Sequence, residues 1–291
     1  TMNLKKITDT TVGRFVTALS DEVGASQPAR LAAAMAYYAM FSFAPAIFVA
    51  ITVASIFIGQ LAASGQLFTQ LARVVGPDTA RFVYDLVVNV SVSASEGNPL
   101  ITLISVLALL YAASGLFVNL KYSLNTIWDV PLATYSGIIG FIKTRLLAFV
   151  MVISLGLLLV LTTFGSLVVA VLDSFFKWGG FVPTVNFFTS VVLLAVSLLL
   201  VYKIVPDTRI AWRDVWLGAV LTALLIRVGA ALVGIYLSLS NFGSAFEAAG
   251  ALAVLLLAIY YLAMIFLFGA IFTKVYASMF GSRATPEMEE R

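Results

Sequence analysis

The sequence contains no cysteine and no histidine, which removes several kinds of chemistry. Disulfide bonds, thiolate nucleophiles and imidazole acid–base catalysis each need one of these residues. Charge is scarce as well, because only 11% of the residues are charged, against about 25% in a typical soluble domain. Such a chain cannot cover a water-facing surface, so we expect its excess apolar surface to face lipid.

Recognisable reaction machinery is also lacking. No GxxxxGK[ST] phosphate loop occurs, and the 14 acidic residues are scattered along the chain. A ribonuclease would need histidine, a metal-binding carboxylate cluster or a basic groove for RNA. We therefore predict no enzyme activity and no catalytic residues, with no metal, no cofactor and no nucleic-acid partner.

Long apolar runs dominate what is present, since 62% of the residues are hydrophobic. A helix of about 20 apolar residues crosses a bilayer. The runs predict an all-α, polytopic membrane protein whose transmembrane domain covers residues 29–277. Its six transmembrane helices are expected at about residues 31–59, 99–120, 144–171, 185–204, 213–238 and 246–274.

The segments between and beyond these runs carry weaker patterns. Helical spacing of apolar residues in segment 1–28 predicts an amphipathic helix on the inner membrane surface. Segment 60–98 predicts two short amphipathic helices on the outer side, separated by Gly76-Pro77. The polar segment 278–291 is typical of a disordered tail.

Basic residues set the predicted orientation. With the N-terminus inside, thirteen Lys and Arg fall in inner segments and three, Arg73, Arg81 and Lys177, in outer ones. This bias indicates an even number of spans with both termini in the cytoplasm. Four tryptophans near span ends are predicted to anchor the protein at the membrane interfaces: Trp128, Trp178, Trp212 and Trp216.

Four ordered motifs add a family resemblance. They are Arg30 to Tyr38 with Ser42 and Pro45, Leu120 to Trp128 with its Leu-Asn-x-x-Trp segment, Val205-Pro206 to Asp214 with Gly218-Ala219, and Gly243 to Phe246 with Tyr260-Tyr261 and Gly269-Ala270. Together they resemble the YihY family of bacterial inner-membrane proteins, also called the virulence factor BrkB family and once labelled ribonuclease BN. The resemblance implies an inner-membrane protein for which envelope-lipid transport is one proposal. This sequence departs from the family pattern at Ile271, where the family usually carries Glu. Any role of that carboxylate therefore cannot be assigned to this protein.

Arg227 is the most conspicuous charge, because it lies near the middle of the fifth predicted span. A charge there costs about 2.5–3.5 kcal/mol on the insertion scale. Ala223, Ala230 and Gly234 share its helical face, so we expect Arg227 to point into the protein. It either contacts an anionic substrate or bonds structurally to backbone carbonyls.

Mid-span polar residues complete the candidate site. Substrate-binding candidates beside Arg227 are Tyr111, Ser114, Asn119, Tyr260 and Tyr261, and gating candidates are Tyr37, Tyr38, Ser42 and Pro45. Ordinary interhelical hydrogen bonding and packing are the alternative for each. The leading hypothesis is transport or flipping of an anionic or amphipathic small molecule, with membrane lipids as surroundings and no ATP. The alternatives are an envelope assembly scaffold and an intramembrane lipid enzyme, and the oligomeric state stays open.

Overall fold

The computed structural model describes residues 10–42, 111–131 except 113, 182–239 and 247–283, with scattered positions at 65–85 and 140–165. Within these ranges every regular element is a helix and no strand occurs. The predicted all-α class is therefore confirmed for this part of the chain. The first three predicted spans, Pro45, Trp178 and segment 278–291 fall wholly or largely outside it. The described positions between 65 and 85 are helical.

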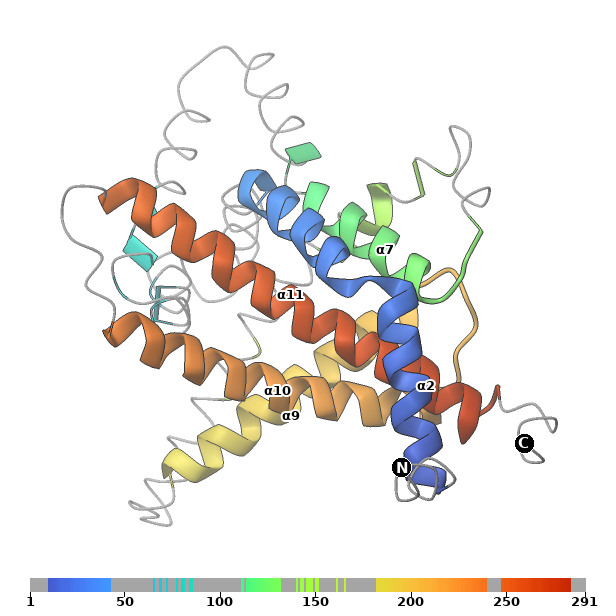
Figure 1. Cartoon of the computed structure of the whole chain (residues 1–291). Coiled ribbons are helices and arrows are strands. Elements are labelled where there is room, and N and C mark those ends of the chain that lie inside the picture. Colours follow the sequence, from blue (N-terminus) through green and yellow to red (C-terminus); the bar gives the residue numbers. More distant parts are fainter. Residues whose placement is uncertain are drawn as a thin grey trace, which may run out of the picture.

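Five principal helices define the arrangement (Figure 1). They are α2 (Thr11–Ser26), α7 (Gly115–Ile127), α9 (Val182–Ile204), α10 (Trp212–Leu239) and α11 (Glu247–Met279), and residues 28–42 form a further helix. Three stretches among the described residues are long and apolar enough to cross a membrane: Phe187–Ile204, Trp212–Leu232 and Ala253–Met279. They coincide with the fourth, fifth and sixth spans predicted from the sequence.

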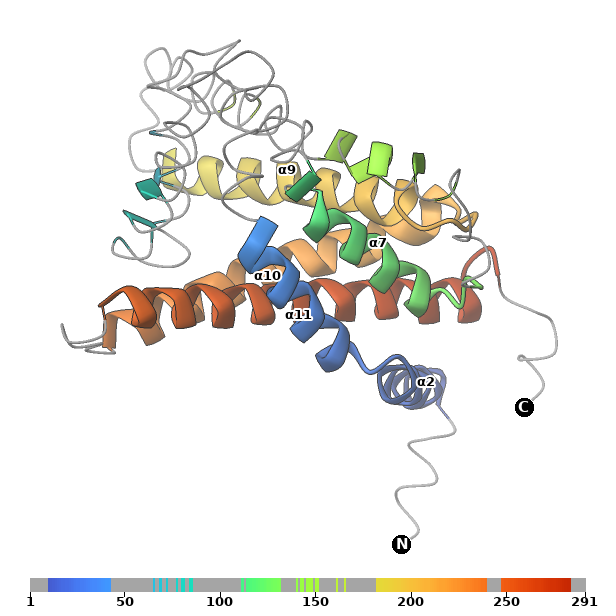
Figure 2. The same cartoon turned by 90° about the horizontal axis from the view of Figure 1, so that it is seen from above.

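Helix α2 lies outside this group of long helices. Thr10 caps its start, because the Thr10 hydroxyl accepts a hydrogen bond from the Gly13 amide at 3.1 Å. Gln27 ends it in the left-handed conformation, with φ of 46°. The two views show α2 crossing α11 at a steep angle, near the C-terminal end of α11 (Figure 2). There the Phe15 ring packs edge-on against Phe272, with 5.3 Å between ring centroids.

Helices α10 and α11 approach closely because each places a glycine beneath a threonine of the other. A side chain on Gly269 would overlap the Thr222 hydroxyl, and one on Gly218 would overlap the Thr273 hydroxyl. Small residues allow this proximity in membrane helices. Both hydroxyls stay bonded within their own helix, with Thr222 donating to the Gly218 carbonyl at 2.6 Å and Thr273 to the Gly269 carbonyl at 2.7 Å. This packing accounts for the two Gly-Ala motifs.

Helix α9 joins the pair through one buried tyrosine. The Tyr202 hydroxyl donates to the Phe266 carbonyl on α11 at 2.6 Å and lies 3.1 Å from the Thr222 hydroxyl on α10. Tyr202 is 1% exposed, so its hydroxyl depends on these partners rather than on water. The three helices therefore form one packed unit.

Candidate functional site

Polar residues from separated segments meet at one end of this unit. The Lys121 ammonium on α7 lies 2.8 Å from the Asp207 carboxylate in the turn between α9 and α10. Asn125, one turn further along α7, donates to the same carboxylate at 3.2 Å and accepts from the Asp207 amide at 2.8 Å. The side chain of Lys121 is only 4% exposed. Asn125 of the Leu-Asn-x-x-Trp motif thus holds the Val-Pro-Asp turn.

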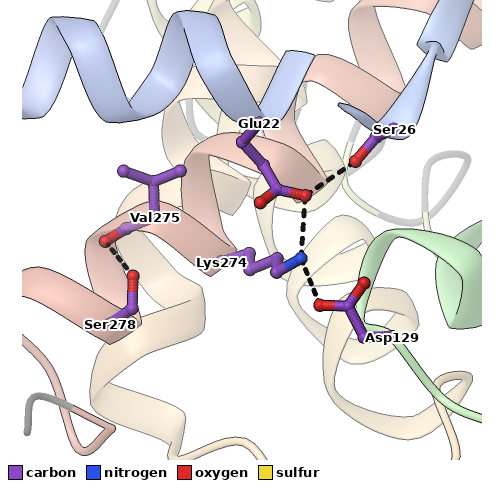
Figure 3. A network of polar contacts seen from close by, with 6 residues as sticks. All are labelled: Glu22, Ser26, Asp129, Lys274, Val275 and Ser278. Atoms are coloured by element: carbon purple, nitrogen blue, oxygen red, sulfur yellow. Dashed lines mark hydrogen bonds and ion pairs between the residues drawn. The ribbon is translucent and has the colours of Figure 1, made fainter. Parts of the chain in front are cut away.

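A second cluster ties α2 to the same end. The Lys274 ammonium on α11 lies 2.7 Å from the Glu22 carboxylate and 2.6 Å from that of Asp129, just beyond α7 (Figure 3). Ser26 donates to Glu22 at 2.7 Å. Three segments that the basic-residue count assigns to one side of the membrane therefore lie together.

The chain beyond α11 folds back onto this end. Asp214, near the start of α10, is 1% exposed and accepts from the Ser282 amide at 3.2 Å and the Ser282 hydroxyl at 2.5 Å. Arg283 donates to the Arg209 carbonyl at 2.8 Å and lies 5.0 Å from the Trp128 ring centroid. Trp128 is 5% exposed, so its prediction as an interface anchor is wrong, because it follows α7 directly and packs into the same buried core as Leu124 and Ile127. Trp212 and Trp216 are exposed, as that prediction requires.

A cavity of about 510 Å³ opens beside α7, within the usual size range of small-molecule sites. Four residues spaced i, i+3, i+4 and i+7 form its α7 wall: Gly115, Val118, Asn119 and Tyr122. Its other described lining residues are Tyr38, Ser42, Tyr111, Ala112 and Arg145. Arg145 is the one charged residue among these nine, so the described lining favours an anion.

Arg145 is held in the cavity by two predicted site residues. Its guanidinium carbon lies 3.8 Å from the Tyr111 ring centroid, and its Nη1 donates to the Ser114 hydroxyl at 2.6 Å. Stacking on an aromatic ring and a planar set of donors suit arginine to anion recognition. Sequence reasoning missed Arg145, because its place at the start of the third predicted span resembles an ordinary positive-inside residue.

Ser42 joins the helix over residues 28–42 to α7. Its hydroxyl accepts from the Leu116 amide at 3.1 Å, and a Cβ on Gly115 would lie 2.6 Å from the same oxygen. The lack of a side chain at Gly115 permits this approach. The structure therefore places Tyr38, Ser42, Tyr111 and Asn119 around one cavity, and Ser114 contacts the Arg145 side chain that lines it.

The remaining candidates lie elsewhere. The expectation that Arg227 points inward is wrong, since its side chain is exposed and its guanidinium carbon lies 5.3 Å from the Phe187 ring centroid. The buried face of α10 is centred on Val215, Ala219 and Thr222, which leaves Arg227 at the edge of that face. Tyr260 and Tyr261 contact each other, and Tyr37 is exposed beside Phe41. No cluster of metal-ligating residues occurs in the described part of the chain.

Comparison with known proteins supplies the family. Comparison with the curated proteins and with the solved structures gave no match. The family model for virulence factor BrkB matches residues 19–291, nearly the whole chain and every motif quoted above. Ile271, which stands at the departure from the usual pattern, is fully buried beside Gly269 and Ala270 in the α10–α11 core. This chain, with helices long and apolar enough to cross a membrane, therefore belongs to the virulence factor BrkB family.

Proposed function

We propose that this protein moves an anionic, amphipathic small molecule across the bacterial inner membrane, without hydrolysing ATP itself. The observation that carries the proposal is the cavity, in which Arg145 stacks on Tyr111 and supplies the positive charge. An envelope lipid is one candidate substrate. The orientation with both termini in the cytoplasm belongs to the same proposal.

The rest of the cavity lining favours an amphipathic ligand over a small hydrophilic one. Tyr38, Tyr111 and Tyr122 contribute aromatic rings, and Val118 and Ala112 add aliphatic surface. Asn119 is the one amide side chain among the described lining residues. A site of mainly apolar walls with a few directed polar groups is typical of ligands that carry an apolar body and a charged end.

Depth along α7 also supports a membrane substrate. Ser114, which holds Arg145, precedes Lys121 by seven residues, or about 10 Å at 1.5 Å per residue. The Arg145 contact therefore lies within the bundle rather than among the ion pairs at its end. A charge within a membrane is costly, so an intramembrane charge is by default a candidate functional residue.

Reconstitution into liposomes tests the proposal. Purified protein should accelerate transbilayer movement of fluorescent phosphatidylglycerol over protein-free liposomes, and more than that of phosphatidylcholine. Arg145→Gln should slow this movement about 10- to 150-fold, as expected when a hydrogen bond to a charged group worth about 1.5–3 kcal/mol is lost. Arg145→Lys should retain part of the rate, because charge survives without the planar donors.

Lys143→Gln is the matched control, because Lys143 is an exposed cation two residues away and does not line the cavity. Its rate should stay within about twofold of wild type. If the wild-type protein moves neither the lipids nor a soluble organic phosphate faster than protein-free liposomes do, transport is rejected and the scaffold alternative is favoured.

A further inference from the structure

Helix α7 presents two different faces to two different parts of the protein. Asn119 and Tyr122 line the cavity, whereas Lys121 and Asn125 contact the turn that carries Asp207. These residues alternate within two helical turns of one element. Any movement of α7 must therefore change the cavity wall and the Asp207 contacts together.

The partner of the second face is a closely packed unit. Asp207 lies between α9 and α10, and these helices are joined to α11 by the Tyr202 hydroxyl and by the threonines seated over Gly218 and Gly269. A shift of α10 against α11 would force side chains through backbone. Movement between α7 and the α9–α11 unit requires no such overlap at these positions. It would separate the polar contacts together with the packing of Leu124 and Ile127, which are buried in the same core cluster.

We infer that Lys121, Asn125 and Asp207 form a latch that holds α7 against the α9–α11 unit and thereby controls access to the Arg145 cavity. The inference rests on the proposed function only in taking this cavity as the substrate site. Asn125 and Asp207 are 82 positions apart in the chain, so the latch joins separate helices. Lys121 is nearly inaccessible, so its charge is shielded from water while the pair is formed.

Cysteine accessibility tests the latch directly, because the natural sequence contains no cysteine. Asn119→Cys supplies a reporter in the cavity wall, and its rate of reaction with a soluble maleimide is measured in proteoliposomes. Lys121→Gln together with Asp207→Asn removes both charges while keeping size and hydrogen-bonding groups. In this background the reporter should react at least fivefold faster. Exchange of the charges, by Lys121→Asp with Asp207→Lys, should return the rate to within about twofold of the original.

A second reporter distinguishes release of a latch from loss of structure. Val215→Cys replaces a fully buried residue of the α10 face by a side chain that is no larger, and it should stay unreactive in every background. Unchanged labelling at position 119 would overturn the latch. An equal increase at both reporter positions would also overturn it, because Lys121 and Asp207 would then stabilise the whole fold rather than control the cavity. The labelling assay does not depend on transport. The latch can therefore be confirmed or rejected independently of the proposed function.

Discussion

The hydroxyl of Thr222 occupies the space that a side chain on Gly269 would need. The reciprocal contact joins Thr273 to Gly218, so α10 and α11 meet through two matched glycine–threonine seats. Apolar side chains gain little by leaving lipid for another helix, so van der Waals contact at short range has to supply the attraction. These contacts hold α10 against α11.

Gly269→Ala should therefore destabilise the protein, although alanine is the better helix former. The new methyl group must displace the Thr222 hydroxyl and the Tyr202 hydroxyl, which would lie 2.6 Å from it. Overpacking of this kind costs about 1–3 kcal/mol. The melting temperature in detergent measures the loss. Gly24→Ala is the control, because no atom lies within 4 Å of its added Cβ, and it should leave the melting temperature unchanged or raise it.

The two acidic partners of Lys274 should contribute unequally to stability. Glu22 is 21% exposed at its side chain and also accepts from Ser26, whereas Asp129 is 78% exposed. An exposed pair contributes about 0.2–1 kcal/mol and is screened by salt. Glu22→Gln should therefore lower the melting temperature more than Asp129→Asn does.

Asparagine suits this comparison because it tolerates the positive φ of 53° at position 129, so the change isolates the charge. Melting curves at low and high salt provide the measurement. An equal loss for both variants, or a larger one for Asp129→Asn, would contradict the assignment of α2 docking to the Glu22 contact.

Arg227→Leu tests whether Arg227, rather than Arg145, contacts an anionic substrate. Arg227 is exposed over Phe187, and an exposed cation–π contact contributes only about 0.5–1 kcal/mol. Leucine suits a membrane helix better than arginine. We expect an unchanged or higher melting temperature and wild-type lipid movement, in contrast to Arg145→Gln. Loss of movement at an unchanged melting temperature would place Arg227 on the substrate path after all.

The orientation of the chain is tested by reporter fusions. Fusions after residue 278 and within 121–143 should report cytoplasm, and fusions near 76 or 179 should report the outside, because thirteen basic residues fall on the predicted inner side against three. The ion pairs of Lys274 with Glu22 and Asp129 require the first two regions to lie at one end. A fusion near 179 that reports cytoplasm would break the six-span prediction.

The sequence by itself determined the helical class, the last three spans, the α2 helix and the family. Each depends on local properties, such as the length of an apolar run, the spacing of apolar residues in α2, or motifs of adjacent residues. A run such as Ala253–Met279 is long enough to cross a bilayer whatever its neighbours are. Positions such as Tyr111, Ser114 and Asn119 also stood out, because polar groups are rare within spans.

Only the tertiary structure decided which of these residues meet. Asn125 and Asp207 are 82 residues apart, and Arg145 is 31 residues from Ser114, so no local pattern reveals either contact. Arg227 stands out in the sequence as a mid-span charge, yet it lies on an exposed helix edge, whereas Arg145, at the start of a predicted span, lines a cavity. The physical reason is that a charged side chain takes its partners from other helices, and helix packing determines which of them lie within reach.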